Sequence, residues 1–92
     1  MALLHMDVEA VEGTHAKMRS SKEYILGELT TLNNQINQTI GTNWIGNSAN
    51  EFQQNYDQFR SALTQQLDAL EQLTQALQSE IQQWQEMSAR MG

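Results

Sequence analysis

His5 and His15 are the side chains of this sequence best suited to bind a metal ion or to exchange protons near neutral pH. They are ten residues apart, and neither has a second pair of ligands at helical spacing, which a metal site needs. His15 instead falls within a row of apolar residues, where a hydrogen-bonded histidine is the simpler interpretation. The sequence therefore predicts no metal site.

Nucleophilic and acid–base chemistry also lack the residues they need. The serines and threonines have no histidine at a suitable position, and the acidic residues are scattered along polar stretches. No glycine-rich phosphate loop is present. Cysteine is absent, so neither thiolate chemistry nor a disulfide is possible. We expect a non-enzymatic protein that uses no cofactor.

The charge balance excludes several classes of partner. Five basic and eleven acidic residues give a net charge of −6, which disfavours nucleic acid and anionic membranes. The cluster of Lys17, Arg19 and Lys22 is interpreted as a solvated helix face. No apolar stretch reaches the length of a membrane span, and residues 1–7 lack the basic start and apolar core of a signal peptide. We therefore expect no stable membrane insertion and no export by the general secretory route.

The elements that position these residues are predicted to be two helices. Proline is absent, and glutamine, leucine, alanine and glutamate dominate, which favours helix. The expected fold is all-α: one domain over residues 1–92, with a helix at about 7–42, a turn at 43–47 and a helix at about 48–90. Asp7 is the expected N-cap of the first helix.

Each predicted helix carries an apolar row whose members alternate three and four residues apart, which places them on one face. His15 and Lys22 interrupt the first row, and polar residues in such a row often determine partner choice. The two rows form the predicted dimer seam, made of Val11, Met18, Ile25, Leu29, Leu32, Ile36, Phe52, Tyr56, Phe59, Leu63, Leu70, Leu73 and Leu77.

Turn-forming residues gather at one place, the segment 41–48. Gly41 or Gly46 is expected to adopt a positive φ at the end of the first helix. Ser48 and Glu51 have the spacing of a capping box for the second helix. A short turn makes the two helices antiparallel. Two helices alone cannot cover both rows, so a second hairpin is expected to complete a four-helix bundle.

The centre of the turn reads Trp44-Ile45-Gly46, followed by small residues, Glu51 and Phe52. With two amphipathic helices and no cysteine, the whole chain resembles the WXG100 (ESAT-6-like) family of type VII secretion substrates. The resemblance implies a protein made in the cytoplasm without a cleavable signal peptide and secreted as a folded dimer. It also implies recognition by the type VII (ESX) machinery and its membrane ATPase. Trp44 and Gly46 would form part of the export signal.

The second part of that signal in the family, Tyr-x-x-x-Asp/Glu beyond the second helix, has no counterpart here. Trp84 is followed at that spacing by Ser88, and Tyr56 by Arg60. Tyr24 and Glu28 match only inside the first helix. A partner could supply the missing signal, so a heterodimer with a second WXG100 protein stays open beside the preferred homodimer.

Two other functions remain open from the sequence. A cytoplasmic helical scaffold or adaptor that binds a partner protein without being exported would use the same apolar rows. A membrane-surface hairpin is disfavoured by the net charge and by the lack of a basic polar face. Whether an exported protein would act as a co-secretion partner or as an effector is not decided by these residues.

Overall fold

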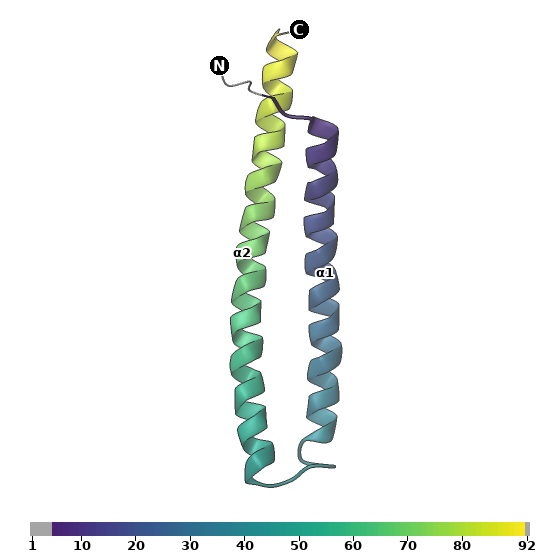
Figure 1. The fold of residues 1–92 in the computed structure, drawn as a ribbon, viewed down its shortest axis with the longest axis vertical. Coiled ribbons are helices and arrows are strands. Elements are labelled where there is room, and N and C mark those ends of the chain that lie inside the picture. Colours follow the sequence, from purple (N-terminus) through teal and green to yellow (C-terminus); the bar gives the residue numbers. More distant parts are fainter. Residues whose placement is uncertain (1–4, 92) are drawn as a thin grey trace.

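The computed structural model describes residues 5–91, which form a hairpin of two long helices (Figure 1). α1 spans Val8–Thr39 and α2 spans Asn47–Met91. The helices are antiparallel and packed along their length, and the molecule measures 68 × 22 × 18 Å. α2 is the longer helix and projects past the start of α1 (Figure 1). The all-α hairpin is confirmed, whereas the four-helix bundle stays a prediction.

α1 begins where its sequence provides a cap. Asp7 has an extended backbone, and its carboxylate accepts a hydrogen bond of 3.1 Å from the N–H of Ala10. This satisfies one of the amide groups that a helix start leaves unpaired, and it confirms the predicted N-cap. α1 ends at Thr39, three residues before the predicted end, because Ile40 is already extended with ψ 129°.

The turn between the helices is closed by its own backbone hydrogen bonds. The N–H of Gly41 donates to the carbonyl of Trp44 at 2.9 Å, and the N–H of Trp44 donates to the carbonyl of Thr39 at 3.1 Å. Both candidate glycines have positive φ, 89° at Gly41 and 130° at Gly46. Side-chain-bearing residues rarely adopt these angles, so the path of the chain depends on the two glycines.

The start of α2 differs from the predicted capping box. The helix already begins at Asn47, so Ser48 lies inside its first turn and is not the N-cap. The N–H of Asn50 donates to the carbonyl of Gly46 at 3.1 Å and closes that first turn. The positive φ of Gly46 turns the chain sharply enough for the helix to start one residue earlier than predicted.

The core of the hairpin is a single row on α2 that faces α1. Its buried members are seven or eleven residues apart, spacings that return to the same helical face. Ile81 is the largest fully buried side chain of this row, with 2% of its surface exposed, and Ile36 is the buried residue of α1. The row consists of Ala49, Tyr56, Leu67, Thr74 and Ile81.

Thr74 is the polar member of this row. Its hydroxyl donates to the carbonyl of Leu70, one turn earlier in the same helix, at 2.7 Å. A buried hydroxyl that is hydrogen-bonded in this way avoids most of the cost of desolvation.

Within residues 5–91, no helix is both long and apolar enough to cross a membrane.

Candidate functional site

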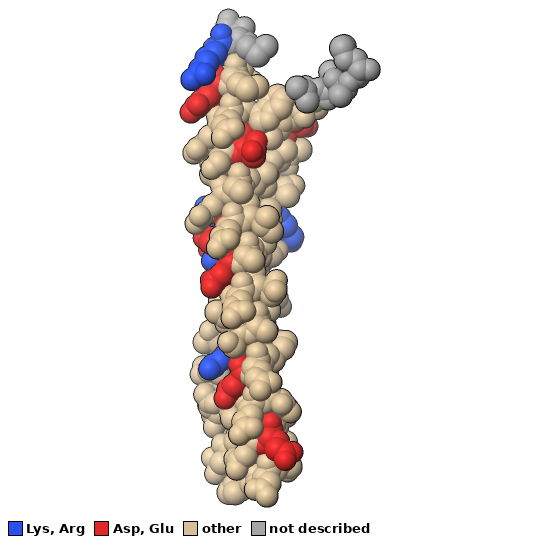
Figure 2. Space-filling view, turned by 90° about the vertical axis from the view of Figure 1, so that its left-hand side faces the viewer, with Lys and Arg blue, Asp and Glu red and all other residues tan. Residues whose placement is uncertain are grey.

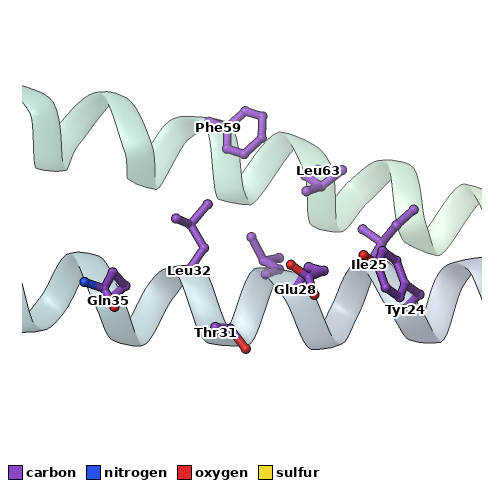
Figure 3. Close-up of a pocket in the computed structure, with 9 residues that line it drawn as sticks. Tyr24, Ile25, Glu28, Thr31, Leu32, Gln35, Phe59 and Leu63 are labelled. Atoms are coloured by element: carbon purple, nitrogen blue, oxygen red, sulfur yellow. The ribbon is translucent and has the colours of Figure 1, made fainter.

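An open apolar groove runs between α1 and α2 on one side of the hairpin (Figure 3). In Figure 3, Leu32 and Ile25 extend from α1 toward α2, which contributes Phe59 and Leu63. The residues that line the groove are Tyr24, Ile25, Glu28, Leu29, Thr31, Leu32, Gln35, Phe59 and Leu63. We call the side of the hairpin that carries this groove the apolar side.

Large apolar side chains are exposed along the apolar side. Tyr24 is 69% exposed and Phe59 is 54% exposed. On α2, the exposed side chains of Phe52, Phe59, Leu73 and Met87 are separated by seven or fourteen residues, so they form one row beside the buried row. Gln66 and Glu80 occupy the intervening positions, so the row is an interrupted series of exposed apolar side chains. Exposed apolar surface of this kind is typical of interaction sites.

The apolar side continues to the turn. A second hollow there is lined by Gln35, Ile36, Thr39, Ile40, Trp44 and Phe52, and it shares Gln35 with the groove. The rings of Trp44 and Phe52 lie with their centroids 5.5 Å apart. Trp44 is 37% exposed and Ile45 is 77% exposed, so the tip of the hairpin presents apolar surface to solvent.

The opposite side of the hairpin is polar and holds the cross-helix hydrogen bonds and ion pair. Lys22 Nζ lies 3.7 Å from Glu71 Oε1. Arg60 donates to Asn33 Oδ1 at 3.0 Å. A third contact, 3.0 Å long, joins Gln85 Nε2 to Glu12 Oε1. Lys22, Leu26 and Arg19 line one hollow on this side. Asn33 follows Leu26 by two helical turns, and Glu12 precedes Arg19 by two turns, so both lie on the same face of α1 as that hollow. The three contacts therefore share one side, which we call the polar side.

Charged groups are sparse over much of the surface. Figure 2 shows a side on which a few acidic and basic groups lie among wide uncharged regions. Within residues 5–91, no group of three or more His, Asp or Glu side chains is arranged to hold a metal ion. The surface available to other molecules therefore consists mainly of exposed apolar side chains, with a few charged side chains at defined positions.

The predicted dimer seam divides into two groups in the structure. Ile36 and Tyr56 are buried inside the hairpin, while Leu32, Phe52, Phe59 and Leu73 are exposed. The remaining members are half-buried at the boundary: Val11, Met18, Ile25, Leu29, Leu63, Leu70 and Leu77. The role of the exposed and half-buried group in dimerisation stays a prediction.

Sequence reasoning did not separate these two groups, and it left Leu67, Thr74 and Ile81 out of the seam. Leu67 and Ile81 are fourteen residues apart, which was a usable signal for a second row. The polar Thr74 between them concealed it. In the structure the hydroxyl of Thr74 is bonded to its own helix, so the row packs as though it were apolar.

His15 and Lys22 lie on the polar side, and their proposed role in partner choice stays a prediction. Lys22 is paired within the chain with Glu71. His15 is half-buried and lines a hollow with Arg19, Glu71, Thr74, Gln75 and Gln78. The two residues therefore contribute to the hairpin itself, in addition to any role toward a partner.

Comparison with known proteins identifies one family. The family model described as "WXG100: Proteins of 100 residues with WXG" matches residues 3–87. The match includes both helices except the last residues of α2, together with the turn that contains Trp44 and Gly46. No curated protein and no solved structure matches the chain.

Proposed function

Because the chain belongs to the WXG100 family of small non-enzymatic type VII secretion substrates, we propose that it is exported, folded and paired, by a type VII (ESX) system. In this proposal, its partner is a second hairpin, either another copy or a second WXG100 protein. The pair acts as a secretion substrate or co-secretion partner, and Trp44 and Gly46 contact the export machinery and its membrane ATPase.

The main support for the proposal is that the turn is both exposed and held in one backbone conformation. Trp44 and Ile45 stand at one extreme of a rod 68 Å long, with much of their apolar surface open. The backbone around them is fixed by hydrogen bonds from Gly41 to Trp44 and from Trp44 to Thr39. A receptor that binds this tip meets an ordered surface, so little conformational entropy is lost on binding.

The apolar side supports pairing of hairpins. Exposed side chains such as Tyr24 and Phe59 line the same groove, Tyr24 from α1 and Phe59 from α2. At about 1.5–3 kcal/mol for each large apolar side chain that becomes buried, covering this side stabilises the protein substantially. A rod with one side covered by a second hairpin has the arrangement of a four-helix bundle.

The test is to measure export of variants in cells with and without the type VII ATPase. We expect Trp44→Ala to reduce the amount of protein in the medium at least tenfold, with Trp44→Phe retaining part of the export. The matched control is Thr42→Ala, an exposed polar position in the same turn, which should be exported normally.

Circular dichroism of each purified variant shows whether the helices are retained, so loss of export can be separated from loss of folding. Export of Trp44→Ala at the level of the unmodified protein would contradict a role for the turn. Retention of the unmodified protein inside cells that have an active ATPase would favour a cytoplasmic scaffold or adaptor.

A further inference from the structure

We propose that the protein of the export machinery that binds the turn, here called the receptor, encloses residues 36–50 on all sides in an uncharged cavity. We call residues 36–50 the turn end. This inference rests on the proposed function, because it specifies the chemistry and the shape of the surface that binds the turn. It follows from the distribution of charge along the rod, from the side chains exposed around the turn end and from the order of its backbone.

Charged residues are absent from one end of the rod. All eleven acidic and all five basic residues of the chain lie outside residues 29–50. In Figure 2, which has the same vertical axis as Figure 1, the extreme of the turn end lies at the bottom and shows no charged group. The opposite end, where α1 starts and α2 finishes, carries Asp7, Glu9, Glu12, Glu86 and Arg90.

Uncharged side chains are exposed on several sides of the turn end. Gln38 follows the buried Ile36 by two residues, which turns it about 200° around α1 and away from α2. Asn50 precedes Phe52 by two residues, so it lies on the opposite side of α2 from the apolar side. Thr42 is exposed in the turn itself. The uncharged surface therefore surrounds the end of the rod and is not confined to the apolar side.

An end without charge is suited to complete enclosure, because the cost of removing a group from water depends on its charge. A buried ion costs far more than a buried amide or hydroxyl, whose hydrogen bonds to water can be replaced by hydrogen bonds to a partner. Charged residues are accordingly depleted at the centres of protein interfaces. A receptor that contacted one side of the turn would require only that side to be uncharged.

Exposed apolar side chains provide the contacts at the bottom of such a cavity. Ile45 is 77% exposed, and Trp44 borders the hollow at the end of the apolar side. The N–H of Asn43 donates to the carbonyl of Thr39 at 2.9 Å, which adds to the hydrogen bonds that order the turn. An ordered end enters a cavity with little loss of conformational entropy. We therefore expect apolar groups of the receptor opposite Ile45 and Trp44, surrounded by uncharged hydrogen-bonding groups.

Glu51 indicates how deep the cavity is. It is the first charged residue after the turn end, and it lies about 6 Å along α2 from Asn47 at 1.5 Å per residue. On α1 the nearest charged residue is Glu28, which lies about 16 Å from Thr39. A cavity about one helical turn deep therefore encloses the turn end without burying a charge, and the exposed Glu51 stays at its rim.

The first test measures the export of variants that place a charge of either sign at the turn end. We expect Gln38→Glu, Gln38→Lys, Asn50→Glu and Asn50→Lys each to reduce the protein in the medium by about tenfold or more, since either charge must be removed from water. The matched controls are Gln65→Glu and Gln65→Lys, at an exposed position about 27 Å from the start of α2. They should be exported normally, and so should Glu51→Gln, because a charge at a rim contributes little.

Effects on folding predict a different pattern in the same variants. A negative charge stabilises the start of a helix and a positive charge stabilises its end. Gln38 is in the last turn of α1 and Asn50 is in the first turn of α2, so folding alone favours lysine at 38 and glutamate at 50. Urea unfolding of the purified variants, followed by circular dichroism, checks this order.

Three results of the export assay would overturn the proposal. Loss of export with only one sign of charge would show that the receptor surface is itself charged. Loss at only one of the two positions would show contact on one side. A loss of export in Glu51→Gln as large as that expected at position 38 would show that the receptor recognises this carboxylate.

The second test determines whether a lipid surface receives the turn end. In the variant Trp84→Phe, Trp44 is the single tryptophan, so its fluorescence reports on the turn end. We expect its emission to stay unchanged when the purified chain is mixed with vesicles of phosphatidylcholine, alone or with phosphatidylglycerol. The control is Trp44→Phe, which retains Trp84. An emission shift to shorter wavelength that is specific to Trp44 would assign the turn end to a membrane surface and overturn the proposal.

The outcomes also separate this inference from the proposed function. Normal export of the charged variants at 38 and 50, together with loss of export in Trp44→Ala, would overturn the enclosure and leave the export role of the turn in place. Normal export of Trp44→Ala would instead overturn the export role of the turn itself.

Discussion

The ring of Trp44 in the turn lies against the ring of Phe52 in the second turn of α2, with the centroids 5.5 Å apart and the planes inclined by 45°. This contact joins the tip of the hairpin to the first residue of the exposed row on α2. Ile36 of α1 and Ile40, which directly follows that helix, line the same hollow. The aromatic pair therefore fixes the turn relative to both helices.

We expect the Trp44–Phe52 contact to stabilise the hairpin by about 0.5–1.5 kcal/mol beyond the area that it buries. The measurement is a double-mutant cycle with Trp44→Ala, Phe52→Ala and the double variant, using urea unfolding followed by circular dichroism. Losses of unfolding free energy that simply add in the double variant would show that the rings do not interact.

Replacing Gly46 by alanine should destabilise the fold. Gly46 has a φ of 130°, and a Cβ added there would meet no atom within 4 Å, so the cost arises from backbone conformation and not from a clash. We expect a loss of about 1–2 kcal/mol in the free energy of unfolding.

The control for that variant is Gly27→Ala. Gly27 lies inside α1, and a Cβ there also meets nothing within 4 Å. Since alanine favours helix over glycine by about 0.8–1.0 kcal/mol, this substitution should stabilise the protein. Opposite signs for the two alanines in the same unfolding assay are the expected result, and equal effects would contradict it.

Tyr56→Phe should stabilise the protein or leave it unchanged. The hydroxyl of Tyr56 is buried and has no hydrogen-bond partner among residues 5–91, so folding removes it from water without replacement. Deleting it should raise the free energy of unfolding by up to about 1 kcal/mol. Tyr24→Phe, at an exposed position, should change stability by less than about 0.5 kcal/mol. A clear loss of stability in Tyr56→Phe would show that the hydroxyl has a partner in the assembled protein.

Ile81→Ala and Leu73→Ala should separate the core of the hairpin from its apolar side. Ile81 is fully buried between the helices, so its truncation should lower the free energy of unfolding by about 2–5 kcal/mol. Leu73 is 62% exposed in the single hairpin. Its truncation should instead weaken self-association in sedimentation while leaving the helix content unchanged. Equal dimer affinity with and without the Leu73 side chain would place the interface elsewhere.

Local features of the fold were predictable from the sequence because they depend on neighbouring residues. The carboxylate of Asp7 can reach the amide of Ala10 only at a helix start, and Gly41 and Gly46 permit angles that other residues disfavour. The Trp44-Ile45-Gly46 turn between two apolar rows was sufficient to identify the family, which the family model confirms over residues 3–87. The end of α1 and the start of α2 were predicted less well, since each depends on how the whole turn closes.

The sequence by itself determined two helices, their apolar rows and the turn that joins them. Only the tertiary structure decided which apolar residues become the core and which stay open to a partner. Tyr56 and Phe59 are three residues apart in one predicted row, yet the first is buried against α1 and the second is exposed. Periodicity defines a face about 100° wide, whereas a single neighbouring helix covers only part of it. The line of contact between α1 and α2 therefore decides which members of the row are covered.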